Sequence, residues 1–200
     1  MTHASFSTHA PRGAVTGETN RPGGPNAPAS AGRRRAIHAY VSANRPAIGR
    51  LLRGDFEIRT MSEAEKLATM LGSHCPDPEQ AAIGFWELLA NAVEHGSFEI
   101  DFAMKSALLL AGTYHAELKR RGGMAPFRDR VVRVQFRQFR RSIRVRIADQ
   151  GRGFDFAAFG PDFSPHFAPN GRGIAMARQM VFSTLTYLGA GNIVEASIRR

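Results

Sequence analysis

The chain has 200 residues, of which 43% are hydrophobic, enough for one packed core and for about one to one and a half domains. Its 27 Lys and Arg against 17 Asp and Glu give a net charge of +10, which suits an anionic partner, although a solvated Arg-rich surface is the alternative. The single cysteine excludes disulfide-rich proteins and cysteine-rich zinc sites. No apolar run approaches the roughly 18 residues of a membrane span, which excludes a membrane-spanning class. We therefore expect a reduced, cytoplasmic protein without a secretory signal.

The first 35 residues predict a disordered basic tail. They contain four Pro, five Gly and no Leu, and they carry five Arg against one Glu. Such a segment buries too little apolar surface to offset the chain entropy that is lost on ordering. Residues 36–53 are expected to form a linker or an N-terminal helix, and the globular domain is expected to span residues 54–200.

The first predicted elements of this domain are a short strand and a helix. Phe56 and Ile58 alternate with polar neighbours, as in a half-buried strand. Thr60 followed by Glu63 is a capping-box pattern, which predicts a helix over about 61–73.

The next helix has signals at both of its ends. Asp77 as the cap and Pro78 in the first turn begin it, and Gly96 in a left-handed conformation is expected to end it. A further helical stretch is expected over residues 99–121, with a break at Gly112.

Period-two alternation then predicts two hairpins. In the first hairpin, apolar residues alternate with cations, which predicts one apolar and one cationic face. The expected elements are strands over 132–137 and 143–147, a Gly-, Phe- and Pro-rich loop over 151–170, a helix over 173–182, and strands over 184–187 and 193–198. Together they predict an α+β fold, a two-layer sandwich in which helices cover one face of a mostly antiparallel sheet.

Three polar side chains interrupt the apolar helix that begins at Pro78. Glu87, Asn91 and His95 fall on one stripe, and polar groups on so apolar a helix favour a site that faces water, ligand or metal. Glu87 could orient a hydroxyl while Asn91 ligates a hard cation. The alternative is that the stripe is the solvent edge of an amphipathic helix. His95 is expected to be a structural group at the helix end, and Glu94 is expected to be solvated.

Two glycine-rich turns add to this stripe. The segment 149–153 (Asp-Gln-Gly-Arg-Gly) follows a strand; its glycines allow a flat ligand to approach the backbone, and its carboxylate can accept a hydrogen bond from an exocyclic amine. The segment 170–173 (Asn-Gly-Arg-Gly) precedes a helix, where backbone N–H groups and an arginine suit a phosphate. Each pattern also occurs in ordinary turns, and neither a P-loop nor a Rossmann fingerprint is present.

In this order, the E-x-x-x-N helix over 87–91 and the two glycine turns resemble the N box and the two glycine boxes of the GHKL (Bergerat-fold) ATPases. The likeness is closest to the anti-sigma-factor serine/threonine kinase branch, which has a histidine kinase-like ATPase domain. The resemblance covers residues 54–200 and extends to a helical insertion over 99–128.

The resemblance implies a site for ATP and Mg²⁺. Asn91 would ligate Mg²⁺, and Glu87 would be the general base that takes a proton from the attacking hydroxyl. Asp149 would receive the adenine amino group, and Gly151 and Gly153 would shape the pocket around it.

The resemblance also assigns the phosphate end of the site. Gly171, Arg172 and Gly173 would hold the phosphates beneath a lid over 155–169. Asn192 stands where many members of the superfamily have a Thr at the adenine site, which leaves the selectivity for adenine open.

Three functions follow from these patterns. The resemblance implies a kinase that transfers the ATP γ-phosphate to Ser or Thr of a small anti-anti-sigma-type antagonist and also binds a sigma factor or another regulator; a homodimer is common in this branch. The second hypothesis is a catalytically silent, nucleotide-gated module that binds proteins. The third is a basic nucleic-acid-binding protein that uses Arg133, Arg137, Arg144 and Arg146. Because no aromatic residue is expected on that cationic face, nucleic acid is not an expected partner, nor is a membrane.

Overall fold

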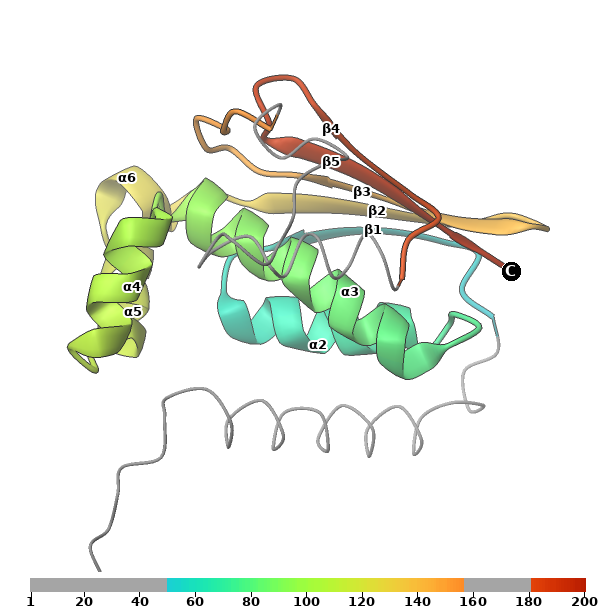
Figure 1. The fold of residues 1–200 in the computed structure, drawn as a ribbon, viewed down its shortest axis with the longest axis horizontal. Coiled ribbons are helices and arrows are strands. Elements are labelled where there is room, and N and C mark those ends of the chain that lie inside the picture. The colour runs from blue at the N-terminus through green and yellow to red at the C-terminus, as the bar shows by residue number, and fades with distance from the viewer. Residues whose placement is uncertain (1–49, 157–180) are drawn as a thin grey trace, which may run out of the picture.

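A computed structural model describes residues 50–156 and 181–200 (Figure 1). The predicted tail, residues 36–49 and the lid beyond Phe156 lie outside the described residues. So do Gly171, Arg172 and Gly173 and all but the last two residues of the helix expected over 173–182. Within the described ranges, no helix combines the length and apolar character that a membrane span requires.

The described residues form a mixed α+β fold around a five-stranded antiparallel sheet. The strands are β1 (Arg53–Ile58), β2 (Val132–Gln138), β3 (Ser142–Ala148), β4 (Thr184–Leu188) and β5 (Ile193–Arg199), in the order β1-β2-β3-β5-β4. Both predicted hairpins are confirmed. Phe136 pairs with Val145, which pairs with Ala196, so the apolar residues of neighbouring strands share one face of the sheet and are buried there.

Two helices, α2 (Met61–Gly72) and α3 (Pro78–Asn91), pack together against this apolar face (Figure 1). The predicted capping box of α2 is confirmed: the Thr60 hydroxyl accepts the Glu63 N–H at 3.2 Å, and the Glu63 carboxylate accepts the Thr60 N–H at 3.0 Å. The predicted start of α3 is also confirmed, since the Asp77 carboxylate accepts the N–H of Gln80 at 3.1 Å.

The end of the second helix differs from the prediction. α3 continues into a π-helix, η1 (Ala92–Ser97), and Gly96 lies inside it, so the left-handed stop predicted at Gly96 is wrong. A positive φ occurs instead at Glu99, two residues after the end of η1, where φ is 52°. A Cβ atom at Gly96 would lie 2.3 Å from the carboxyl carbon of Asp149. The glycine is therefore needed for a close approach between the helix and the end of β3.

The helical insertion forms three short helices, α4 (Phe102–Leu110), α5 (Tyr114–Gly122) and α6 (Ala125–Arg128), at one end of the sheet (Figure 1). The predicted break at Gly112 is confirmed, and this residue has a left-handed φ of 67°. α6 lies beyond the helical stretch expected over 99–121 but within the helical insertion over 99–128 that the resemblance implies. No residue of α4 or α5 is buried, so polar contacts contribute much of what holds the insertion in place.

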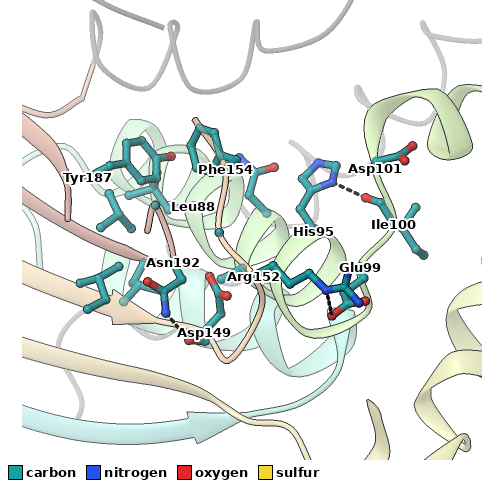
Figure 2. A pocket seen from close by; sticks show the side chains of 18 of the residues that line it. Leu88, His95, Glu99, Ile100, Asp101, Asp149, Arg152, Phe154, Tyr187 and Asn192 are labelled. Carbon is teal, nitrogen blue, oxygen red and sulfur yellow. Dashed lines mark hydrogen bonds and ion pairs between the residues drawn. The ribbon is translucent and has the colours of Figure 1, made fainter. Parts of the chain in front are cut away.

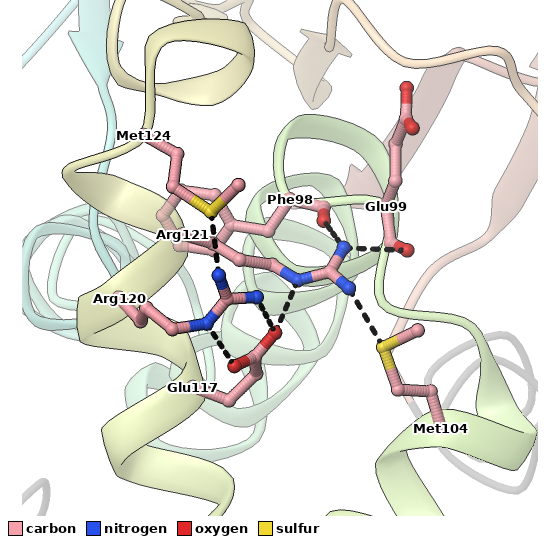
Figure 3. A network of polar contacts seen from close by, with 7 residues as sticks. All are labelled: Phe98, Glu99, Met104, Glu117, Arg120, Arg121 and Met124. Carbon is pink, nitrogen blue, oxygen red and sulfur yellow. Dashed lines mark hydrogen bonds and ion pairs between the residues drawn. The ribbon is translucent and has the colours of Figure 1, made fainter.

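One arginine of α5 joins the insertion to the end of the π-helix. Arg121 donates hydrogen bonds to the carbonyl oxygens of Phe98 at 2.5 Å and Glu99 at 3.2 Å (Figure 3). Its Nε also donates to the Glu117 carboxylate at 2.8 Å. Carbonyl groups at a helix end lack partners within the helix, and a cation that donates to them satisfies both their hydrogen bonding and the helix dipole.

A second arginine, in the segment between α6 and β2, contacts the same end of the π-helix. Arg130 donates to the Ser97 carbonyl oxygen at 3.1 Å and pairs with the Glu99 carboxylate at 2.9 Å. The guanidinium groups of Arg121 and Arg130 lie 5.3 and 5.2 Å from the centre of the Phe127 ring. The buried phenyl ring thus contacts both cations through cation–π interactions and fixes their positions relative to the π-helix.

Candidate functional site

A cavity of about 350 Å³ lies where η1 meets the end of β3 and the β4–β5 hairpin (Figure 2). This volume falls in the range of roughly 300–1,000 Å³ that is typical of small-molecule sites. Much of the lining is apolar and comes from Leu88, Ile147, Phe154, Tyr187, Ile193 and Val194. Among the polar groups that line it are Asn91, His95, Asp149 and Asn192. An apolar cavity with a few polar groups suits a flat ligand with hydrogen-bonding edges.

The structure brings three of the predicted site residues together. Asn91, Asp149 and Gly153 line the same cavity, although the first lies far from the other two in the sequence. Glu87 lies one turn before Asn91 on α3 and is half-buried, but it is not among the residues that line the cavity. The predicted phosphate turn over 171–173 lies outside the described residues.

The turn after β3 requires both glycines of the first glycine motif. A Cβ atom at Gly151 would lie 2.4 Å from the carbonyl oxygen of Gly96. Gly153 has a φ of 77°, and a Cβ atom there would lie 2.0 Å from the carbonyl oxygen of Ala190. A side chain at either position would push the turn away from its neighbours and would displace Asp149, which precedes both.

Asp149 is fixed at the end of β3 by backbone hydrogen bonds. Its N–H donates to the Asn192 carbonyl oxygen at 3.0 Å, and the Asn192 side-chain amide donates to the Asp149 carbonyl oxygen at 3.3 Å (Figure 2). Carboxylate Oδ1 accepts the Gly151 N–H at 2.8 Å. Burial raises the pKa of Asp149 to about 6, although this hydrogen bond and the charge of Arg130 lower it. A carboxylate with so perturbed a pKa in a cavity is typical of a functional group.

His95, the third member of the predicted polar stripe, also lines the cavity. Its Nδ1 contacts the Ile100 carbonyl oxygen, so Nδ1 carries the proton, and the ring packs against Phe102 with the centroids 4.5 Å apart. Burial lowers the pKa of His95, which favours the neutral ring. Its Nε2 is buried and has no hydrogen-bond partner among the described residues. His95 is thus a helix-end group, as predicted, but it also lines the cavity and has a vacant acceptor.

Glu94 is buried, and the expectation that it is solvated is wrong. Its side chain is 1% exposed, and Oε2 forms an ion pair with Lys105 Nζ of α4 at 2.6 Å. Oε1 has no hydrogen-bond partner in the described part of the chain. Glu94 lies in the first turn of η1, and Lys105 of α4 supplies the partner for its buried charge.

The lining of the cavity offers an oxygen atom that Mg²⁺ could accept as a ligand and a carboxylate that could accept hydrogen bonds from a nucleoside. No group of three or more His, Cys, Asp or Glu in residues 50–156 and 181–200 could hold a metal ion by itself. Mg²⁺ is usually bound through only one or two protein ligands together with substrate phosphates and water, and the side-chain oxygen of Asn91 is a suitable oxygen donor. The Asp149 carboxylate is an acceptor for the amine or hydroxyl groups of a nucleoside, while His95 Nε2 is buried.

Ion pairs neutralise most of the predicted cationic face of the β2–β3 hairpin. Three of its four arginines pair with carboxylates: Arg133 with Glu57 at 3.1 Å, Arg137 with Asp55 at 3.0 Å, and Arg146 with Glu195. The fourth, Arg144, has its guanidinium 5.2 Å from the centre of the Phe139 ring. This face therefore offers fewer unpaired charges than the sequence indicates.

No known protein family matches the chain, and no curated protein matches its sequence. The cavity and its lining are therefore the basis for a functional conclusion.

Proposed function

We propose that the cavity binds ATP with Mg²⁺ and that the protein is a regulatory serine/threonine kinase of the anti-sigma-factor type with a Bergerat fold. The observation that carries this proposal is that Asn91 and Asp149, from two motifs far apart in the chain, line one cavity. The antiparallel sheet with α2 and α3 on one face supports the same fold.

The described residues supply two parts of the proposed binding site, one for the base and one for Mg²⁺. Asp149 accepts a hydrogen bond from the exocyclic amine of the base, and the rings of Phe154 and Tyr187, 4.9 Å apart between centroids, add apolar surface nearby. Asn91 supplies an oxygen ligand for Mg²⁺, which neutralises charge on the phosphates when it is bound. Residues 171–173 remain the predicted phosphate-binding turn.

Phosphoryl transfer in this proposal depends on Glu87. A Ser or Thr hydroxyl of the partner protein attacks the terminal phosphate, its proton passes to the Glu87 carboxylate, and ADP leaves. A general base typically contributes roughly 10²- to 10⁴-fold to such a rate. The expected partners remain a small antagonist protein and a sigma factor or similar regulator.

A catalytically silent module is the second candidate function. It is favoured by the position of Glu87, which is not among the residues that line the cavity. Such a protein would bind the nucleotide and change its protein-binding state without transferring phosphate.

Thermal unfolding with Mg²⁺ and ATP tests nucleotide binding. At a ligand concentration 100 times the Kd, the wild type should gain roughly 2.7 kcal/mol of stability. Asp149→Asn should remove most of this gain, because the amide cannot replace the carboxylate as an ionic acceptor. The matched control is Asp129→Asn, which makes the same change at an exposed carboxylate after α6. A folded wild type that gains nothing from Mg²⁺ and ATP would contradict the proposal.

Transfer of label from γ-labelled ATP to the proteins of a desalted cell extract separates the two candidates. The kinase proposal expects transfer by the wild type and by Glu79→Gln, which changes an exposed carboxylate on the same helix. Glu87→Gln should keep the thermal shift but lose at least 100-fold in transfer rate. A wild type that binds ATP and labels no protein would instead support the silent module.

A further inference from the structure

Five arginines gather at the end of the sheet that lies opposite the cavity. The arginine tip consists of Arg140, Arg141, Arg144, Arg199 and Arg200, together with Phe139. β3 begins at the tip with Ser142 and ends beside Asp149 in the cavity. At about 3.4 Å per residue, this seven-residue strand separates the two places by roughly 20 Å. The tip is therefore distinct from the proposed nucleotide site.

Backbone contacts fix the tip. The turn between β2 and β3 is closed by a hydrogen bond from the Phe139 N–H to the Ser142 carbonyl oxygen at 2.7 Å. The end of the chain is held against this turn, because the Arg200 N–H donates to the Arg141 carbonyl oxygen at 3.1 Å and the Arg200 guanidinium donates to the Phe139 carbonyl oxygen at 3.4 Å. Arginines from β3, β5 and the turn are thereby held in one place.

The charges of the tip are not neutralised within the described part of the chain. All five arginines are exposed, and none forms an ion pair with a described residue. The carboxylate of Asp55, on the neighbouring part of β1, is already shared by Arg53 at 3.2 Å and Arg137 at 3.0 Å. Like charges held this close repel one another, so an anion that binds between them is strongly favoured.

The segments of the 200 residues that lie outside the described ranges carry little negative charge that could supply this anion. Residues 1–49 and 157–180 contain only two acidic residues, Glu18 and Asp162. A second copy carries the same net charge of +10 and is repelled. The occupant is therefore an acidic molecule of another kind.

The size of the tip favours an acidic protein segment over a nucleic acid. Neighbouring strands lie about 4.8 Å apart, so the ends of β2, β3 and β5 span roughly 10 Å. Single-stranded nucleic acid is usually followed over about four or more nucleotides with several stacking rings. The tip offers one ring, Phe139, which is 48% exposed. Arginines around an exposed aromatic ring are instead typical of a protein-binding hot spot, where guanidinium groups bind carboxylates in pairs of hydrogen bonds.

We propose that the arginine tip binds an acidic segment of a partner protein in which carboxylates alternate with an apolar side chain. The carboxylates bind the guanidinium groups, and the apolar side chain packs on Phe139. This binding does not depend on the nucleotide site, which lies at the other end of the sheet.

Fluorescence anisotropy of a labelled peptide tests the proposal with the full chain. The probe is a 12-residue peptide of repeated Glu-Asp-Leu, measured in 50 mM salt beside a peptide with Gly in place of Leu and a labelled 10-nucleotide oligo-dT. The wild type should bind the Leu peptide several-fold more tightly than the Gly peptide. Arg140→Glu with Arg141→Glu should weaken this binding at least tenfold, and Phe139→Ala should remove the preference for Leu.

The matched control is Arg59→Glu with Arg128→Glu, which makes the same change in net charge at two exposed arginines away from the tip. It should weaken peptide binding less than twofold. Equal weakening by the two double variants would show nonspecific charge attraction and would overturn the proposal. So would tighter binding of the oligonucleotide, or no peptide binding by the wild type. The tip variant should keep the melting temperature and the Mg²⁺–ATP shift of the wild type, which separates this test from that of the cavity.

Discussion

The buried carboxylate of Asp149 lowers the free energy of unfolding when it is charged. The pKa of its carboxyl is about 6 in the folded protein, against 3.8 for an ordinary Asp, because burial disfavours the charge. Between these two values the folded state holds more protons than the unfolded state. Stability therefore falls as the pH rises from about 4 to 6, and the full cost of the charged carboxylate is present above pH 6.

Asp149→Asn should accordingly stabilise the protein near neutral pH. We expect the free energy of unfolding at pH 7.5 to rise by about 2 kcal/mol, less than the shift alone implies because the carboxylate is partly exposed. At pH 4 the gain should shrink by more than half, since the wild-type carboxyl is then protonated in the folded state. Urea unfolding at the two pH values measures this difference. An equal gain at both values would show that titration is not its cause. A variant that is more stable and yet binds less ATP would mark Asp149 as a binding residue.

The end of the π-helix depends on contacts that other elements supply. Arg120 and Arg121 both pair with Glu117, so their positions in the sequence look equivalent. Only Arg121 reaches the carbonyl oxygens of Phe98 and Glu99, and its side chain is 12% exposed against 56% for Arg120 (Figure 3). The two neighbouring arginines therefore provide a matched comparison.

Arg121→Ala should lower the free energy of unfolding by about 2 kcal/mol, because it leaves carbonyl groups of the helix end without their donor. Arg120→Ala should leave stability close to that of the wild type, since an exposed ion pair contributes little. Urea unfolding of both variants measures the effect. Similar losses in the two variants would mean that the shared Glu117, and not the carbonyl contacts, is what matters.

Elements with local signals could be predicted from the sequence, and those set by distant contacts could not. The caps at Thr60 and Asp77 and the alternating hairpins were correct because each signal lies within a few residues of its effect. The π-helix was missed because Gly96 is there to admit the side chain of Asp149, which comes from another part of the chain. The burial of Glu94 was also missed, because its partner Lys105 lies on α4, in another element.

The residues of the cavity likewise differ in how far the sequence could predict them. The order of three motifs predicted that Asn91 and Asp149 belong to one site, and both side chains line the same cavity. The vacant acceptor of His95 could not be predicted, because it depends on the bond between Nδ1 and the Ile100 carbonyl oxygen after the helix. Tyr187 carries no motif either, and only the folded β4–β5 hairpin places it in the lining.

Packing is uneven over the whole molecule. The sheet with α2 and α3 contains most of the large, fully buried side chains of the described residues, including Phe85, Phe136 and Leu89. α4 is apolar in composition, yet none of its residues is buried, and Leu110 is 88% exposed. Local stability follows the burial of apolar contacts, so the two regions should open with different free energies.

Native-state hydrogen exchange should therefore resolve two levels of protection. Amides of β2, β3 and α3 are expected to exchange only through global unfolding, while those of α4 exchange through local opening and at least tenfold faster. Mass spectrometry of peptides from each region measures the rates. Equal protection of α4 and β3 would show that the insertion is as firmly anchored as the core.

The aromatic ring of Phe127 links the effects of substitutions at separate positions of the chain. It contacts the guanidinium groups of Arg121 and Arg130, which donate to carbonyl oxygens at the end of η1, and neither the ring nor these two arginines line the cavity. We expect loss of the ring to remove the support of both guanidinium groups at once. Loss of either arginine should expose the ring to water. We therefore expect the effects of substitutions at positions 121, 127 and 130 on stability to be coupled, because the three side chains share these contacts.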